Sequence, residues 1–170
     1  MSLFAIVLSA SVIALAPGER MPILKSNDLA GKSIVLPDAA AGKPALLAFG
    51  FTYDSRFAVE AWVKQFRQAF PNPSAVTFFE IPMIGGMARL GKWFIDSGMR
   101  KGTPVADHSH VVTVYGGTGE WKERLGVRDG DAAYLLLLDP SGRIAWSYGG
   151  AYDAAKFEEL RNVTKTFLQP

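Results

Sequence analysis

A buried strand followed at once by a long amphipathic helix, in residues 45–70, is the feature that most constrains the fold of this chain. The apolar run Ala45–Phe49 is bounded by Pro44 and Gly50, and this pattern predicts a strand that is buried on both faces. In the next segment apolar side chains recur at helical spacing, at Val59, Trp62, Val63, Phe66 and Phe70. We therefore expect an open α/β sheet, in which the turn after such a strand is the usual place for chemistry.

That turn, Thr52–Phe57, holds the first candidate site residues, which are Asp54, Ser55, Arg56 and Phe57. Asp54 or Ser55 is expected to cap the helix, because a short polar side chain accepts hydrogen bonds from the first free amide groups. The same amides attract anions, so the turn is also a candidate contact for a ligand or a protein partner. Phe57 is expected to lie in the core.

The rest of the chain alternates further strands and helices. The β-type runs, rich in branched and aromatic residues, fall at residues 33–37, 76–81, 110–115, 133–138 and 143–148. Helices are expected at residues 87–99, at residues 116–127 and after the capping residue Asp153. The turn signal Asp139–Gly142 joins the last two strands in a hairpin. This order predicts an α/β domain with a mixed central sheet flanked by helices.

We expect a single domain over residues 21–170, preceded by an apolar segment and a link over residues 1–20. The run Leu3–Ala16 is nearly all apolar and is shorter than the roughly 20 residues that span a bilayer. It has the size of the apolar region of a signal peptide, and Ala14–Ala16 resembles a cleavage site. Because no Lys or Arg precedes the run, a buried N-terminal strand or helix is the alternative. The first interpretation predicts an exported or membrane-associated protein.

The composition excludes whole classes of chemistry. The 170 residues include no cysteine, which removes disulfides, thiol nucleophiles, iron–sulfur clusters and cysteine-bound zinc. We therefore expect no thiol–disulfide exchange, and the sequence indicates no cofactor. A net charge of +2 is too small for the broad basic surface that nucleic acids require, so we expect no nucleic-acid partner.

A basic aromatic segment forms the second group of candidates. The helix expected at residues 87–99 continues into a basic end. Its candidate contact residues are Arg89, Lys92, Trp93, Phe94, Arg100 and Lys101. Such a combination of aromatic and basic side chains can lie on a membrane surface or bind a protein partner. The alternative is an ordinary surface helix that buries its aromatic face in the core.

Both histidines of the chain lie close together, in the segment Asp107–His110. On a strand, His108 and His110 would share one face and could hold a metal ion together with Asp107. A zinc site needs at least three protein ligands, so a further ligand such as Asp54 or Glu80 would have to come from elsewhere. The alternative is a polar loop that leads into a strand.

The order of elements, and two local patterns, resemble the thioredoxin-like fold. The patterns are the entry, Asp28–Lys32 followed by Leu36–Pro37 and Gly42–Phe49, and the ending Leu138–Ile144. In that superfamily a Cys-x-x-Cys motif, or one peroxidatic cysteine, begins the helix after the central strand. The resemblance places Asp54 and Phe57 at the two thiol positions. The loop that usually carries a cis-proline facing the thiols is Arg128–Asp131 here, which contains no proline. The resemblance thus implies a three-layer thioredoxin-like domain without redox activity.

The chain is further similar to an ATP-synthase assembly factor family, called ATPase complex subunit ten. The residues that carry this resemblance are Ala48–Phe51 with Trp62, Phe79–Pro82 with Trp93 and Arg100, Tyr134–Asp139, Gly142–Trp146 and Gly149–Gly150. The resemblance implies a non-catalytic assembly factor or chaperone, whose partners are membrane-sector subunits of ATP synthase. It implies a place at the mitochondrial inner membrane, or on the periplasmic side in a bacterial relative. Two alternatives stay open: a metal-dependent enzyme using Asp107, His108 and His110, and a degenerate peroxiredoxin-like protein that binds small ligands.

Overall fold

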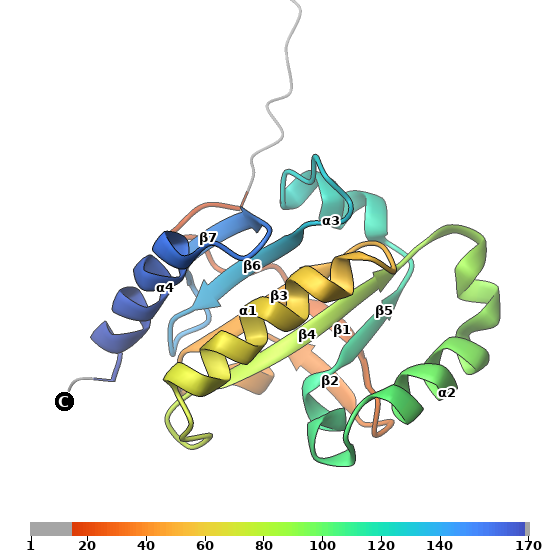
Figure 1. Ribbon diagram of the computed structural model, residues 1–170, viewed down its shortest axis with the longest axis horizontal. Helices are drawn as coiled ribbons and strands as arrows, with labels where there is room; N and C mark the ends of the chain where they lie inside the picture. The colour runs from red at the N-terminus through yellow and green to blue at the C-terminus, as the bar shows by residue number, and fades with distance from the viewer. Residues whose placement is uncertain (1–14, 169–170) are drawn as a thin grey trace, which may run out of the picture.

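The structure is a computed structural model that describes residues 15–168, without the side chains of residues 87–89. Within these residues seven strands form one mixed sheet in the order β2-β1-β5-β4-β3-β6-β7 (Figure 1). The strands are β1 Leu24–Asp28, β2 Ser33–Leu36, β3 Ala45–Gly50, β4 Thr77–Ile84, β5 Val112–Tyr115, β6 Ala133–Leu138 and β7 Ile144–Gly150. The α-helices are α1 Ser55–Ala69, α2 Lys92–Gly102, α3 Thr118–Arg124 and α4 Ala154–Thr166. Short 3-10 helices are η1 Asp38–Ala40, η2 Gly86–Gly91 and η3 Val105–His110.

The three central strands β3, β4 and β5 run parallel, so their carboxyl ends meet at one edge of the sheet. Strands β6 and β7 extend the sheet antiparallel on one side, and β1 and β2 do so on the other. The helices α1 and α2 connect consecutive parallel strands. Because such crossovers are right-handed, both helices lie on the same face of the sheet, where α4 joins them (Figure 1).

Two apolar cores fill the space on the two faces of the sheet. Alternate residues of β3 contribute to both cores, because successive side chains of a strand point to opposite faces of the sheet. Leu46 and Ala48 pack with Trp62 of α1 and residues of α4, whereas Leu47 and Phe49 pack on the other face with Trp121 of α3. All six residues of β3 and all six of β6 are buried. The prediction of a three-layer α/β domain with a mixed sheet is confirmed.

The helix α2 belongs to neither core, although the structure describes all of its residues. The helix expected at residues 87–99 begins only at Lys92, and the 3-10 helix η2 precedes it. The strand expected from residue 110 begins at Val112, because residues 105–110 form the 3-10 helix η3. The helix expected at residues 116–127 is shorter and covers only Thr118–Arg124.

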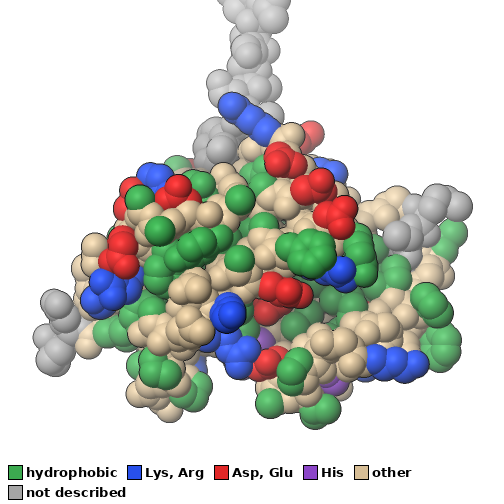
Figure 2. Space-filling view, in the orientation of Figure 1, with side chains coloured by type: hydrophobic (Ala, Val, Ile, Leu, Met, Phe, Trp, Pro, Cys, Tyr) green, Lys and Arg blue, Asp and Glu red, His purple; other side chains and the backbone are tan. Residues whose placement is uncertain are grey.

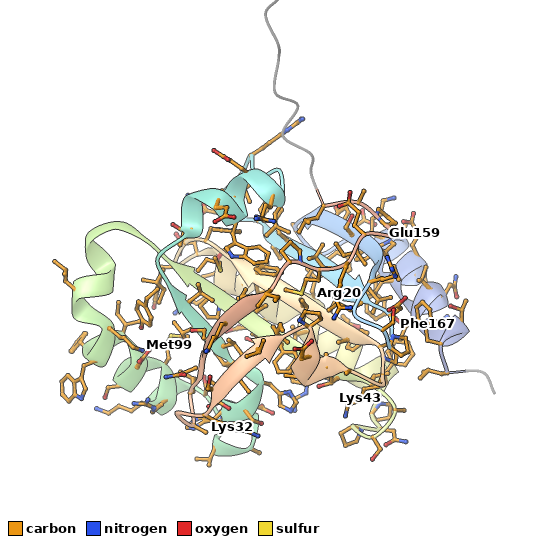
Figure 3. All side chains as sticks on the ribbon, turned by 180° about the vertical axis from the view of Figure 1, so that it is seen from behind. Arg20, Lys32, Lys43, Met99, Glu159 and Phe167 are labelled. Carbon is orange, nitrogen blue, oxygen red and sulfur yellow. The ribbon has the colours of Figure 1, made fainter. Side chains whose placement is uncertain are left out.

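The described chain begins beside α3. The Leu15 amide donates to the Arg124 carbonyl oxygen at 2.9 Å, and the Leu15 side chain packs against the core. Arg20, labelled in Figure 3, forms an isolated β-bridge with Arg143 just before β7. Most of the apolar segment expected at residues 1–20 lies outside the described residues. From residue 15 to residue 168, no helix is both long enough and apolar enough to cross a bilayer.

Candidate functional site

The turn between β3 and α1 is closed by hydrogen bonds between Thr52 and Ser55. The Ser55 amide donates to Thr52 Oγ1 at 3.1 Å, and the Thr52 amide donates to Ser55 Oγ at 3.2 Å. Ser55 Oγ also donates to the Thr52 carbonyl oxygen at 2.7 Å. The expectation that Asp54 or Ser55 caps α1 is therefore wrong. Asp54 has helical φ and ψ angles of −80° and −24° and makes no capping bond, whereas a capping side chain normally needs an extended backbone.

The loop before β6 is fixed across this turn. Thr52 Oγ1 donates to Asp131 Oδ1 at 2.6 Å, so one hydroxyl group joins the turn to the loop. The Tyr134 hydroxyl accepts from the amides of Arg128 and Asp129 at 2.9 and 3.1 Å and donates to the Asp129 carbonyl oxygen. Thr52, Asp131 and Tyr134 are absent from the sequence-based candidates. Thr52 had a usable signal, because it stands three residues before Ser55, which is the spacing of a capping pair.

Three residues form an exposed stack on the outer surface of the turn, which we call the Tyr53–Arg56–Phe57 platform. The Arg56 guanidinium carbon lies 3.8 Å from the centroid of the Tyr53 ring and 4.5 Å from that of Phe57. Tyr53 is 74% exposed and Phe57 is 59% exposed. Such stacks are cation–π contacts, which hold a guanidinium in a fixed plane.

The expectation that Phe57 lies in the core is wrong, and the helix geometry explains why. The buried residues of α1 are Ser55, Val59, Trp62, Val63 and Phe66. Phe57 stands two residues from Ser55 and two from Val59, so its side chain points about 200° away from both. Ser55 takes the buried position and packs against Gly50, where an added β-carbon would lie 2.6 Å from Ser55 Oγ.

The structure does not bring Asp107, His108 and His110 together as a metal site. Asp107 Oδ2 accepts from Arg67 Nη1 at 3.0 Å. His108 Nε2 donates to the Thr103 carbonyl oxygen at 3.0 Å, and His110 Nδ1 donates to that of Phe78 at 2.9 Å.

These contacts follow from the local backbone. In a 3-10 helix, residues two apart point about 240° apart around the axis, whereas on the expected strand they would share a face. Each histidine nitrogen named above must carry a proton, because a carbonyl oxygen can only accept. Among residues 15–168, outside the undescribed side chains, no three His, Asp or Glu residues are grouped to hold a metal ion.

Glu80 is the titratable group with an unusual environment on the sheet face toward α1. Burial, and then the negative charges of Glu60 and Asp107, raise the pKa of Glu80 to about 7, and Arg67 opposes the shift. A carboxyl group with this pKa is about half protonated at neutral pH. The protonation of Glu80 therefore depends on the charges of α1 and η3 around it.

The outer face of α2 is apolar. Three side chains at the spacing i, i+3 and i+4 make up what we call the α2 face: Leu90 from the end of η2, and Trp93 and Phe94 from the first turn of α2. They are 74%, 79% and 76% exposed. In Figure 2 hydrophobic and basic side chains gather at the right, over this helix. The alternative in which the aromatic side chains fill the core is therefore wrong. The side chain of Arg89 lies outside the described residues.

The inner face of α2 carries a buried carboxylate, and hydrogen bonds hold this face to the sheet. Asp96 is only 8% exposed, accepts from the Tyr115 hydroxyl at 2.6 Å and pairs with Lys92 Nζ at 2.5 Å. Burial and the hydrogen bond to Asp96 raise the pKa of Tyr115. Arg100 Nε donates to the Leu29 carbonyl oxygen at 2.7 Å. Met99, labelled in Figure 3, lies on the same side, with its sulfur 3.9 Å from Thr113 Oγ1.

A glycine-lined hollow of about 390 Å³ lies beside the start of η2. Its walls are Leu90, the glycines at the ends of β4 and β5, and the first residues of α3. The first residue of α3 packs closely here, because a β-carbon on Gly85 would lie 2.5 Å from Thr118 Oγ1. The hollow therefore joins the α2 face to the start of α3.

Comparison with known proteins places this geometry in a fold class. No protein-family model matches the chain, and no curated protein matches it. It is similar to a protein from Chlorobium tepidum named as a thiol:disulfide interchange protein, with 16% identity, a TM-score of 0.62 and coverage of 92% of this chain and 100% of the other. A thioredoxin domain of a thiol-disulfide oxidoreductase from Bacteroides vulgatus matches with 20% identity, a TM-score of 0.57 and coverage of 92% and 100%. An exposed lipoprotein thioredoxin from Streptococcus pneumoniae matches with 16% identity, a TM-score of 0.55 and coverage of 83% and 98%.

These likenesses define the fold as thioredoxin-like. The site defines the class further, because the chain has no cysteine and the turn after β3 is closed by Thr52 and Ser55 instead. The chain thus combines a thioredoxin-like fold with a turn that has no thiol for thiol–disulfide exchange. These comparisons do not show the resemblance to the ATP-synthase assembly factors.

Proposed function

We propose that this chain is a non-redox thioredoxin-like binding module that acts as an assembly factor or chaperone on a membrane protein complex. The observation that carries the proposal is the Tyr53–Arg56–Phe57 platform. It occupies the edge of the sheet where the resemblance places the thiols, and it presents two aromatic rings and a guanidinium to solvent. Aromatic and arginine side chains are the types that carry most of the binding energy in protein interfaces.

The platform is built to bind without rearranging. The Thr52–Ser55 hydrogen bonds and the bond from Thr52 to Asp131 fix the backbone beneath it. The two rings restrict the Arg56 side chain, so little conformational entropy is lost when a partner carboxylate or carbonyl group pairs with it. We propose membrane-sector subunits of ATP synthase as the partners, on the resemblance described above.

We further propose that the protein is exported or membrane-associated. The apolar run Leu3–Ala16 supports this location. The similar structure from Streptococcus pneumoniae, which is named as an exposed lipoprotein, also supports it.

The test is a tagged pull-down from detergent-solubilised membranes, with the bound proteins identified by mass spectrometry. The full chain is expected to recover subunits of a membrane complex, with those of the ATP-synthase membrane sector enriched. A double variant, Tyr53→Ala with Phe57→Ala, should recover at least about tenfold less partner, because each exposed aromatic anchor contributes on the order of 1 kcal/mol or more.

The matched control is Ile23→Ala, since Ile23 is an equally exposed apolar residue outside the platform. This control should recover as much partner as the unaltered chain. Recovery of no membrane-complex subunit by the unaltered chain would overturn the proposal. Equal recovery by the double variant would show that the Tyr53–Arg56–Phe57 platform does not bind the partner.

A further inference from the structure

We infer that the α2 face is a lipid-contacting surface, which inserts into the headgroup region of an anionic bilayer. This inference concerns a different surface from the Tyr53–Arg56–Phe57 platform and does not depend on it. Its starting point is the inverted polarity of α2. The helix turns Asp96, its one buried residue, toward the sheet and leaves Trp93 and Phe94 in water. A helix with this pattern has its apolar side available for a second apolar medium.

The size of the α2 face favours lipid over a stable protein partner. Three side chains of this type expose on the order of 400–500 Å² together. A stable protein interface buries about 800 Å² on each partner. Insertion into a bilayer has no such minimum, because the aromatic rings are solvated by the acyl chains around them. Trp and Phe beside basic side chains are the usual composition of helices that lie in the headgroup region.

The charge on the exposed part of α2 is positive. Asp96 is the one acidic residue in the sequence of α2, and it is buried and paired with Lys92. Arg100 and Lys101 stand in the last turn and are exposed. A bilayer with anionic headgroups attracts such side chains, each by about 1 kcal/mol near the surface. The charges therefore complement an anionic surface and not a cationic one.

The start of the described chain and the hollow beside Leu90 lie at the two ends of α3. The apolar run Leu3–Ala16 of the sequence enters the described fold at Leu15, whose amide bonds to Arg124 at the last residue of α3. Leu90 lines the same hollow as Thr118, the first residue of α3. A seven-residue helix is about 10 Å long, so α3 spans the short distance between the two elements. Figures 1 and 3 both show α3 between the start of the described chain and the segment that leads into α2.

The apolar run Leu3–Ala16 of the sequence and the α2 face are two separate candidate attachments to a bilayer. A single short apolar attachment holds a protein only weakly, and stable attachment takes two signals. The α2 face supplies the second signal, and it also fixes how the domain is oriented on the surface.

The first experiment measures binding of the full chain to vesicles by flotation, with vesicles of pure phosphatidylcholine and vesicles containing phosphatidylserine. The unaltered chain should bind the anionic vesicles more strongly. The double variant Trp93→Ala with Phe94→Ala should bind them at least about tenfold more weakly. Lys101→Glu should weaken binding to the anionic vesicles and leave binding to phosphatidylcholine unchanged. Ile23→Ala is the control that should bind like the unaltered chain.

The second experiment locates Trp93 directly. Lipids brominated near the headgroup should quench a part of the tryptophan fluorescence of the unaltered chain. That part should disappear in the variant Trp93→Phe, which keeps an aromatic ring and should still bind. Binding by the Trp93/Phe94 double variant that equals the unaltered chain would overturn the inference, as would a quenched part that survives in Trp93→Phe.

The pull-down separates this inference from the proposed function. In detergent, the Trp93/Phe94 double variant should recover the same partner as the unaltered chain, whereas the Tyr53/Phe57 double variant should lose the partner and keep vesicle binding. A Trp93/Phe94 variant that loses the partner and keeps vesicle binding would identify the α2 face as a protein surface and overturn the inference. Circular dichroism confirms that each variant is folded.

Discussion

The helices α1 and α2 occupy equivalent places in two consecutive strand–helix–strand units, yet they face the sheet in opposite ways. α1 turns an apolar stripe toward the sheet, with Trp62 and Phe66 fully buried, and leaves its charged residues in water. α2 turns Asp96 toward the sheet and leaves Trp93 and Phe94 in water. The comparison teaches that one crossover helix maintains the fold and that the other is free to serve a different surface.

The largest loss of stability is expected for substitution of Trp62, which tests whether α1 maintains the fold. Trp62 is fully buried and lies among the rings of Trp146, Tyr148, Tyr152 and Phe157. Trp62→Ala should lower the free energy of unfolding by about 3–5 kcal/mol, because it removes this packing and leaves a cavity. Chemical denaturation followed by fluorescence measures the change.

Trp93→Ala is the matched control for that substitution. Because its side chain is exposed, it should change the free energy of unfolding by no more than about 0.5 kcal/mol. Equal losses in the two variants would contradict the division of roles between α1 and α2.

The next largest effect concerns Glu80, on the sheet face beside α1. Its pKa is raised from 4.5 to about 7 in the folded chain, chiefly by burial and then by Glu60 and Asp107, with Arg67 opposing. The folded state therefore holds the proton more tightly than the unfolded state, and stability falls as the pH rises from about 4.5 through about 7. Glu80→Gln removes this loss. It should stabilise the chain by up to about 3 kcal/mol at pH 8 and by almost nothing below pH 4.5.

Thermal unfolding at several pH values measures this difference between the variant and the unaltered chain. Glu158→Gln is a suitable control, because the Glu158 side chain is exposed on the surface of α4. A stabilisation by Glu80→Gln that does not depend on pH would contradict the assignment.

Loss of the hydrogen bonds that attach α2 to the sheet should cost about 1–3 kcal/mol of stability. Asp96→Ala leaves the Tyr115 hydroxyl with only the 3.4 Å contact to the Lys92 carbonyl oxygen, and Lys92 without its ion-pair partner. The loss should be local, so amide hydrogen exchange in residues 92–102 should become faster while exchange in α1 stays unchanged. Asp96→Asn keeps an acceptor for Tyr115 and should lose less. Faster exchange in α1 as well would mean that α2 supports the core.

The smallest effect is expected at the turn before α1. Thr52→Ala removes the cap on the Ser55 amide and the bond to Asp131, and should cost about 1 kcal/mol. Thr52→Ser keeps the hydroxyl group and should retain most of this stability, as urea denaturation can measure. Asp54→Ala should have almost no effect, since Asp54 makes no capping bond. A larger loss for Asp54→Ala than for Thr52→Ala would contradict the observed cap.

The buried strands and the main helix could be predicted from apolar runs in the sequence, whereas the exact bounds of short helices and the direction of single side chains could not. β3, β6 and α1 could be predicted because continuous or periodic apolar runs report burial directly. The positions of Phe57, His108 and His110 could not be predicted, because each depends on where a helix begins or on whether a short segment is a strand or a 3-10 helix. The exposure of Trp93 and Phe94 was equally hidden, since periodicity gives the apolar side of a helix and not the direction in which that side points.

The candidate site shows the same limit. The sequence identified the turn at residues 52–57 and the basic aromatic helix as the places of interest. It did not identify Asp131 or Tyr134, because they reach the turn only through the pairing of β3 with β6. Contacts between residues about 80 positions apart have no local signature, so only the assembled sheet reveals them.

The polar attachment of α2 also bears on how such a chain can evolve. Substitutions on the outward side of a helix that shares no apolar packing with the core carry little penalty in folding, so that side can be rewritten residue by residue. Two hydrogen bonds must be kept while that side changes, because they attach α2 to the rest of the domain. They join Tyr115 to Asp96 and Arg100 to Leu29. Proteins of one lineage that keep these two hydrogen bonds can thus acquire a different binding surface on α2 without changes in the sheet.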